Sequence, residues 1–233
     1  MQPGPIDEHL YDREGEVFPC VGEPLAIAGP AGRLEAITSC PETEFTSRAV
    51  AVVCHPHPLY GGTMQNKVVH YLAKSFNDLG LRALRFNFRG VGASEGRYGE
   101  GVGEAADLRA VLAWLGERLP GAEIWLAGFS FGAYVALREA SHGGVAQLVT
   151  VAPPVNFFDF APLPVPSCPW LLIQGDQDEV VPADDVLSWA GGLSPAPEII
   201  SMAGVDHFFH GRLNALRDVL VERLRPAAEA LAR

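Results

Sequence analysis

The sequence predicts an α/β protein built on a mostly parallel sheet with helices on both faces. From residue 49 onward, short continuous apolar runs alternate with segments of helix length. Strands covered on both faces have this apolar character, and helical connections between them are typical of parallel pairing. The segment 64–78 supports the helical half of the pattern, because its apolar residues recur every three or four positions: Val68, Leu72, Phe76 and Leu79.

Taken in order, the chain predicts a hairpin followed by alternating strands and helices. Residues 24–28 and 33–40 form two strands around the turn 29–32, which is rich in Gly and Pro. The segment 152–169 is rich in Pro and Phe; it predicts a loop too short to form a separate lid domain. The remaining strands are expected at 49–54, 81–88, 123–129, 146–152, 170–175 and 198–202, and the helices at 64–78, 103–119, 130–141, 182–191 and from about 210.

Length and charge limit the organisation and the partners. The 233 residues, of which 48% are hydrophobic, predict a polar N-terminal leader over 1–20 and one domain over 21–233. The formal net charge of −11 without a basic run argues against nucleic acid and anionic membranes as partners. Monomer and homodimer both remain open.

The leader and the cysteines indicate a compartment. The first fifteen residues lack the apolar region of a signal peptide, and no run is long enough to span a membrane, so a cytoplasmic location is expected. The four cysteines have no metal-binding spacing, and a chain of this length does not need a disulfide framework. We therefore expect reduced thiols at Cys20, Cys40, Cys54 and Cys168.

The motif G-x-S-x-G occurs twice, centred on Ser94 and Ser130. Only the second copy joins an apolar run directly to a helix-forming segment. A nucleophile elbow requires that strand-turn-helix setting, because the sharp turn lifts the hydroxyl above the sheet. The turn also leaves the Phe131 amide at a helix N-terminus, where it can stabilise an oxyanion. Without partners, Ser130 could equally be an ordinary helix N-cap.

An acid and a base follow Ser130 in chain order. A serine nucleophile needs a base, and the base needs a carboxylate to fix its tautomer. Asp178 is preferred to Asp176, which lies at the tight strand exit and is expected to support the turn. His207 is preferred to His210, which is expected to begin the last helix. Asp206 is interpreted as a turn or cap residue, because adjacent side chains generally diverge.

The loop after the first parallel strand should supply a second oxyanion donor. Proline has no N–H at positions 56 and 58, so the candidates are the amides of His57, Leu59 and Tyr60, with His57 preferred. His55 and His57 could instead suggest a metal, but no thiolate pair or HExxH motif accompanies them. No metal and no cofactor are expected.

With these motifs in order, the sequence resembles the α/β-hydrolase superfamily, and more narrowly the small lidless bacterial serine hydrolases related to dienelactone hydrolases. The segments that carry the resemblance are CHPHPLYGGTMQNKVV, FRGVGASEG, GFSFG, QGDQDEVVP and DHFFHGR. It implies about eight strands, no large lid domain, and the roles already derived: nucleophile Ser130, acid Asp178, base His207 and oxyanion donor Phe131. The usual His-Gly after the third strand is His55-Pro56 here, and a serine nucleophile argues against a dienelactone substrate.

The expected function is hydrolysis of carboxylic esters or thioesters of small to medium hydrophobic acyl groups through an acyl-enzyme on Ser130. Peptidase activity is least expected, and the acidic charge weakly disfavours polyanionic thioesters unless Lys67, Arg89 and Arg97 offset it. The alternative is a non-catalytic hydrolase fold that binds a small ligand or a protein partner. The predicted pocket residues, about half of which could be core, are Leu59, Tyr60, Phe129, Phe157, Phe158 and Phe208.

Overall fold

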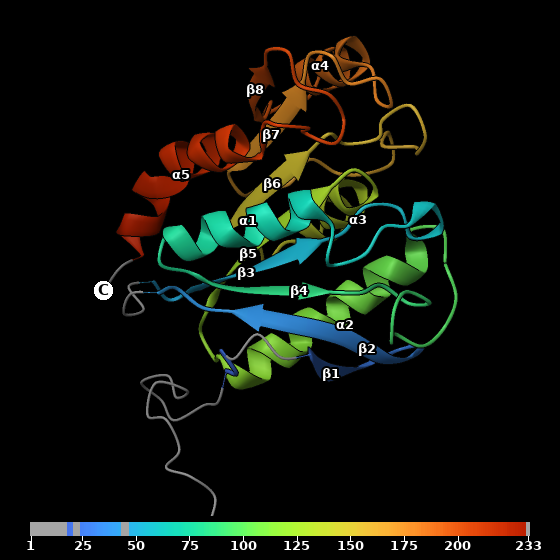
Figure 1. Cartoon of the computed structure of the whole chain (residues 1–233), viewed down its shortest axis with the longest axis vertical. Coiled ribbons are helices and arrows are strands. Elements are labelled where there is room, and N and C mark those ends of the chain that lie inside the picture. The colour runs from blue at the N-terminus through green and yellow to red at the C-terminus, as the bar shows by residue number, and fades with distance from the viewer. Residues whose placement is uncertain (1–17, 21–23, 43–46, 232–233) are drawn as a thin grey trace, which may run out of the picture.

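The computed structural model describes residues 18–20, 24–42 and 47–231. They form one eight-stranded sheet with helices packed against it (Figure 1). The strands lie in the order β1-β2-β4-β3-β5-β6-β7-β8. β2 runs antiparallel to both of its neighbours, and every other adjacent pair is parallel. The strand bounds are β1 Pro24–Gly29, β2 Gly32–Ser39, β3 Ala49–Cys54, β4 Arg82–Phe86, β5 Glu123–Phe129, β6 Gln147–Val151, β7 Trp170–Gly175 and β8 Glu198–Met202.

Helices cover both faces of the sheet, as predicted. α1 and α5 pack on one face, while α2, α3 and α4 pack on the other (Figure 1). Each face has its own apolar core, and every residue of β3 is buried between them. The helix bounds are α1 Lys67–Asp78, α2 Val102–Arg118, α3 Phe131–Ala140, α4 Ala183–Gly191 and α5 Leu213–Ala230, with a short 3₁₀ turn η2 at Pro58–Tyr60. None of these described helices combines the length and apolar character that crossing a bilayer requires.

Two helices begin later than the sequence pattern predicts. α1 starts at Lys67 because the Asn66 side chain accepts the amides of Val68 and Val69 and so caps the helix. The last helix starts at Leu213, since Phe209 and Gly211 have positive φ angles that a right-handed helix does not contain. The predicted loop over 152–169 contains no helix or strand.

The expectation of reduced thiols was wrong for two of the four cysteines. Cys20 and Cys40 form a disulfide, whereas Cys54 and Cys168 are free. Residues 18–20 lie beside the end of β2, where Phe18 is buried and Thr38 donates a hydrogen bond to the Pro19 carbonyl. This packing brings the Cys20 and Cys40 Cα atoms to 5.4 Å, within the usual span of a disulfide.

Candidate active site

Ser130 lies at a sharp turn between β5 and α3. Its φ and ψ angles are 54° and −121°, a sparsely populated conformation for a residue with a side chain. The glycines on either side permit close backbone approaches. A Cβ on Gly128 would lie 2.1 Å from the Gly132 carbonyl oxygen, and one on Gly132 would lie 2.3 Å from the Cys54 carbonyl oxygen. The turn therefore places the serine at the carboxyl edge of the sheet, next to the end of β3.

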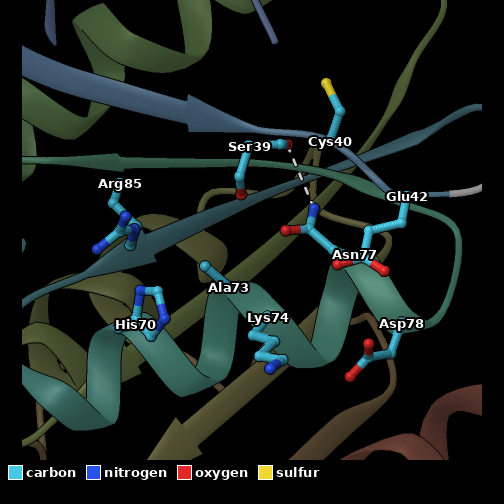
Figure 2. A pocket seen from close by; sticks show the side chains of 9 residues that line it. All are labelled: Ser39, Cys40, Glu42, His70, Ala73, Lys74, Asn77, Asp78 and Arg85. Carbon is cyan, nitrogen blue, oxygen red and sulfur yellow. Dashed lines mark hydrogen bonds between the residues drawn. The ribbon is translucent and has the colours of Figure 1, made fainter. Parts of the chain in front are cut away.

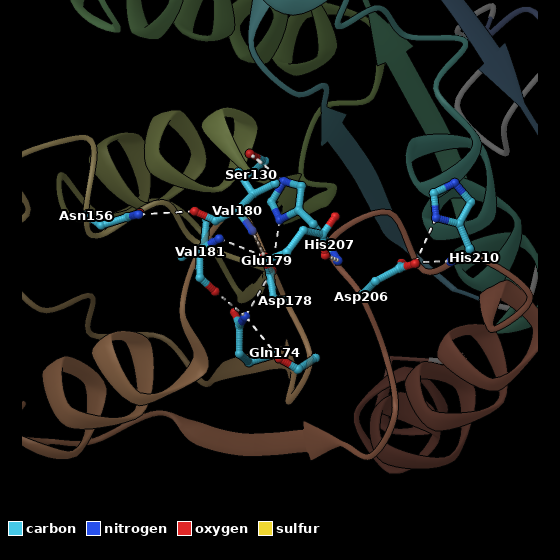
Figure 3. A network of polar contacts seen from close by, with 11 residues as sticks. Ser130, Asn156, Gln174, Asp178, Glu179, Val180, Val181, Asp206, His207 and His210 are labelled. Atoms are coloured by element: carbon cyan, nitrogen blue, oxygen red, sulfur yellow. Dashed lines mark hydrogen bonds and ion pairs between the residues drawn. The ribbon is translucent and has the colours of Figure 1, made fainter.

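Three side chains from separate loops form one chain of hydrogen bonds (Figure 3). The Ser130 Oγ lies 3.2 Å from His207 Nε2, and His207 Nδ1 lies 2.8 Å from Asp178 Oδ2. All three residues are less than 10% exposed. Because Asp178 accepts the Nδ1 proton, the Nε2 lone pair of the neutral ring is left to accept the serine proton.

The Asp178 carboxylate is held by further donors. Its Oδ1 accepts the backbone amides of Val180 and Val181 at 2.9 and 2.7 Å. Its Oδ2 accepts Nε2 of the fully buried Gln174 at 3.0 Å in addition to the histidine. Four N–H groups, including that of His207, thus bind the two carboxylate oxygens. They fix the orientation in which Asp178 accepts the His207 proton.

The other predicted candidates have partners elsewhere. Asp176 accepts the Gly204 amide at 2.7 Å, which joins the loops after β7 and β8. Asp206 and His210 pair with each other at 2.8 Å in an exposed position. The Ser94 hydroxyl accepts the Glu35 amide and donates to the Asn87 carbonyl. Neither of these aspartates bonds to His207, and Ser94 has no histidine partner in the described part of the chain.

Two residues that line the cleft with Ser130 have backbone amides that are free to donate. Within the described ranges, neither the Phe131 nor the His57 N–H has a hydrogen-bond acceptor. The amides of Tyr60 and Gly62 instead donate to the His57 carbonyl, which fixes this loop. Gly62 has to be a glycine, because a Cβ there would lie 2.1 Å from the Pro56 carbonyl oxygen. His57 lines the same cleft as Ser130 and Phe131.

The imidazoles of His55 and His57 both have partners on each nitrogen. His55 Nε2 accepts the Phe88 amide at 3.0 Å, and its Nδ1 lies 2.6 Å from the Pro56 carbonyl oxygen. Burial lowers the pKa of His55 to about 4. His57 Nδ1 accepts the Leu59 amide, and its Nε2 lies 3.1 Å from the Tyr98 hydroxyl. These contacts leave no lone pair aimed at a shared metal and oppose the metal hydrolase alternative.

A cleft of about 560 Å³ opens above Ser130 and His207. Of the predicted pocket residues, Tyr60, Phe157, Phe158 and Phe208 line it. Three of these side chains are more than 40% exposed, so they form its rim. The lining also includes residues that the sequence analysis did not select: Pro56, Gly61, Gly62, Asn66, Pro154 and Val180.

Two pocket predictions were wrong. Phe129 is fully buried in the core of the α1 and α5 face, where its ring supports that of His207 at a centroid distance of 5.1 Å. It ends β5 with its side chain inside the protein, so it lies beneath the site. Leu59 is 67% exposed on the η2 turn and does not line the cleft. Both residues lie in segments expected at the carboxyl edge of the sheet, but their side chains point away from the cleft.

One residue of the possible basic patch is already paired. Arg89 makes a two-pronged contact with buried Asp107, at 2.9 and 2.7 Å. The neighbouring Glu104 accepts the amides of Gly99 and Gly101, which orders the start of α2. The Arg89 charge is therefore neutralised by Asp107 and does not contribute to a basic patch.

An eight-stranded, mostly parallel sheet with a strained serine turn at its carboxyl edge is the arrangement of the α/β-hydrolase fold. The family model of the alpha/beta hydrolase fold matches residues 52–167. An alpha-beta serine hydrolase homologue from Coxiella burnetii is 50% identical, covers 89% of this chain and 99% of its own, and has a TM-score of 0.86. A serine hydrolase without a lid from Xanthomonas campestris is 41% identical over 90% of this chain and 96% of its own, with a TM-score of 0.87.

A curated relative is similar over most of both chains. An uncharacterized protein from Rickettsia prowazekii is 39% identical over 210 residues, which are 83% of this chain and 86% of that protein. The chain belongs to the α/β-hydrolase family, among the serine hydrolases without a lid. The predicted fold is thereby confirmed, while the narrower relation to dienelactone hydrolases stays a prediction.

Proposed function

We propose that this hydrolase cleaves carboxylic esters or thioesters of small to medium hydrophobic acyl groups, with Ser130 as nucleophile. The observation that carries the proposal is the continuous hydrogen-bonded chain from Ser130 through His207 to Asp178, set at the floor of an apolar cleft. A serine becomes nucleophilic near neutral pH only beside a base whose tautomer is fixed, and this chain supplies both.

In the first step, the Ser130 Oγ attacks the acyl carbon while His207 Nε2 takes the hydroxyl proton. The carbonyl π electrons move onto oxygen, and a tetrahedral intermediate forms. Asp178 stabilises the imidazolium without taking its proton. His207 then gives that proton to the leaving alcohol or thiol as the bond to the acyl carbon breaks, which leaves an ester on Ser130.

The oxyanion of each tetrahedral intermediate needs fixed donors. The amides of Phe131 and His57 are suited to this role, because they have no other acceptor in the described structure and both residues line the cleft with Ser130. In the second step, water attacks the acyl-enzyme, His207 takes a proton from that water, and the acid leaves as Ser130 regains its hydrogen. Every group in this cycle belongs to the chain, the substrate or water.

The cleft favours apolar substrates of limited size. Its walls present aromatic side chains from three loops, those after β3, β6 and β8. The Phe158 ring stacks on Tyr134 at a centroid distance of 4.8 Å. A volume of about 560 Å³ lies within the range of small-molecule sites. The partner we propose is therefore a small-molecule ester or thioester.

The test is hydrolysis of p-nitrophenyl esters from acetyl to lauroyl, together with the matching thioesters. We expect a burst of p-nitrophenol equal to the active-site concentration if deacylation is slower than acylation, and an optimum at short to medium chains. Ser130→Ala should remove turnover, and Ser94→Ala should keep it. Folded protein without turnover on any member, combined with saturable binding of an ester analogue, would favour the non-catalytic alternative.

A further inference from the structure

A second pocket lies between α1, β4 and the end of β2, and shares no lining residue with the cleft at Ser130 (Figure 2). Its volume is about 430 Å³. Arg85 and His70 lie at one end, with Lys74 between this end and the acidic end formed by Glu42 and Asp78. The pocket is therefore polar, and its charges are unevenly distributed.

Arg85 is the unusual member of this pocket. It lies on β4 on the face that packs against α1, and it is only 7% exposed. Its guanidinium donates from Nη1 to the Met64 carbonyl at 2.9 Å. Among the residues that the structure describes, it has no other hydrogen bond and no carboxylate partner. Arg89, by contrast, has both oxygens of Asp107. A buried cation is costly unless an anion or several acceptors compensate it.

Two further nitrogen groups lie beside Arg85. His70 and Lys74 are one helical turn apart on α1, so both side chains line the pocket from the same side. Burial and the positive charges of Arg85 and Lys74 lower the pKa of His70. An anion placed among these groups would oppose that effect, so the His70 ring can report on occupancy.

The acidic end does not neutralise this cluster. Asp78 already pairs with Arg217 of α5. Glu42 lines the pocket but makes no ion pair with another described residue. The two ends of the pocket would therefore attract opposite parts of a ligand, and the buried end would attract its anionic group.

We propose that the pocket of Arg85, His70 and Lys74 binds a small oxyanion, the carboxylate or phosphate group of a small molecule. The planar guanidinium matches two oxygens of either group, with Lys74 as a point charge and neutral His70 as a further donor. The site is separate from the proposed hydrolysis, so it can be tested without substrate.

The experiment is an NMR titration of the His70 ring in the full chain, assigned with His70→Gln. Inorganic phosphate and acetate are added separately at constant ionic strength. We expect at least one of them to raise the pKa of His70 by about half a unit or more, with saturation, because the added negative charge favours the imidazolium. The exposed ring of His142 should not change and serves as the reference. Response to phosphate alone assigns phosphate chemistry, and response to acetate assigns carboxylate chemistry.

Variants distinguish a site from general screening. Arg85→Met should abolish the shift, and Lys74→Met, at an exposed position, should weaken the apparent affinity about tenfold. Arg118→Met, which removes an arginine that lies over Trp114 on the opposite face, should leave the shift intact. The proposal is overturned if neither anion moves His70, if His142 moves equally, or if the shift survives in Lys74→Met with unchanged affinity. The Lys74→Met result tests the proposal even if Arg85→Met does not fold.

Discussion

The two G-x-S-x-G segments have the same motif and contrast in structure. Ser94 and Ser130 are almost equally buried, at 7% and 9% exposure, so accessibility does not separate them. Ser94 lies in a loop, and both of its hydrogen bonds go to the backbone. Ser130 itself has the positive φ angle and meets His207. In the first copy the glycines provide the positive φ angles, at 56° and 93° for Gly92 and Gly96.

The amide that follows each serine shows the same contrast. The Glu95 amide donates to the Arg33 carbonyl at 2.8 Å, which closes the loop onto β2. The Phe131 amide begins α3 and has no acceptor within the described residues. A motif thus becomes a candidate catalytic turn only where strand and helix leave both a hydroxyl and an amide available.

The largest expected difference is in kcat between variants of the two serines. Ser130→Ala should lower kcat for a good ester by about 10⁴-fold or more, because no other hydroxyl of the described residues bonds to His207. Ser94→Ala should keep kcat within about twofold, yet lower the free energy of unfolding by about 1–3 kcal/mol, because one buried and one partly buried backbone group lose their partner. Steady-state kinetics and urea unfolding measure both. Equal activity losses in the two variants would remove the contrast.

The second comparison concerns the aspartates two residues apart. Asp178→Asn should reduce kcat by about 10³–10⁴-fold, because an amide at this position disturbs the His207 tautomer. Asp176→Asn should reduce it by less than about threefold, since the Gly204 amide is the one partner of its carboxylate within the described ranges. Near-normal turnover by Asp178→Asn would contradict the proposed role of the carboxylate.

The third comparison tests the free amides. His57 has a φ of −56°, which proline can adopt, so His57→Pro deletes the N–H without forcing a new backbone angle. We expect kcat for His57→Pro to be about 10²–10³-fold below that of His57→Ala, which loses the same ring and keeps the amide. If the two variants have equal kcat, the second oxyanion donor lies elsewhere.

His55 links the start of the Ser94 loop to the loop that contains His57, and it should make stability depend on pH. It accepts the Phe88 amide at the start of the Ser94 loop, and its other nitrogen meets the Pro56 carbonyl before His57. Its folded pKa is about 4, below the usual value of 6.5, so the unfolded chain binds the proton more readily. The contribution of His55 is complete above about pH 6.5, and about 3 kcal/mol is lost as the pH falls to about 4.

Urea unfolding across this range measures the slope. In His55→Gln the acid-dependent loss should be smaller by the same amount, even though the variant is less stable at neutral pH. An unchanged slope in the variant, or an NMR pKa for His55 near 6.5, would contradict this assignment.

The smallest expected effect on kcat concerns the hydrogen bond from Gln174 to Asp178. Gln174→Met removes a donor to Asp178 Oδ2 and should lower kcat about tenfold, with an altered pH profile. Gln147→Met is the matched control, because this glutamine is also buried but donates to the Leu148 and Pro169 carbonyls. It should leave the pH profile unchanged. Identical profiles in the two variants would make Gln174 a purely structural residue.

The sequence was sufficient for the fold, because apolar runs and helical spacing are local signals. It also selected Ser130, Asp178 and His207, since chain order and strand ends predict which loops meet. It could not predict that Cys20 reaches Cys40 or that Phe129 points beneath His207, because both depend on packing between distant segments. Gln174 and Arg85 lie inside strands that read as core, so only the structure brings their polar atoms to notice.

The most direct test of the central claim is the intact mass of the protein after treatment with a fluorophosphonate. Wild type, Ser130→Ala and Ser94→Ala are compared after circular dichroism shows that all three are folded. We expect one adduct on wild type and on Ser94→Ala, and none on Ser130→Ala. A folded wild type without an adduct, or an adduct lost only in Ser94→Ala, would contradict it.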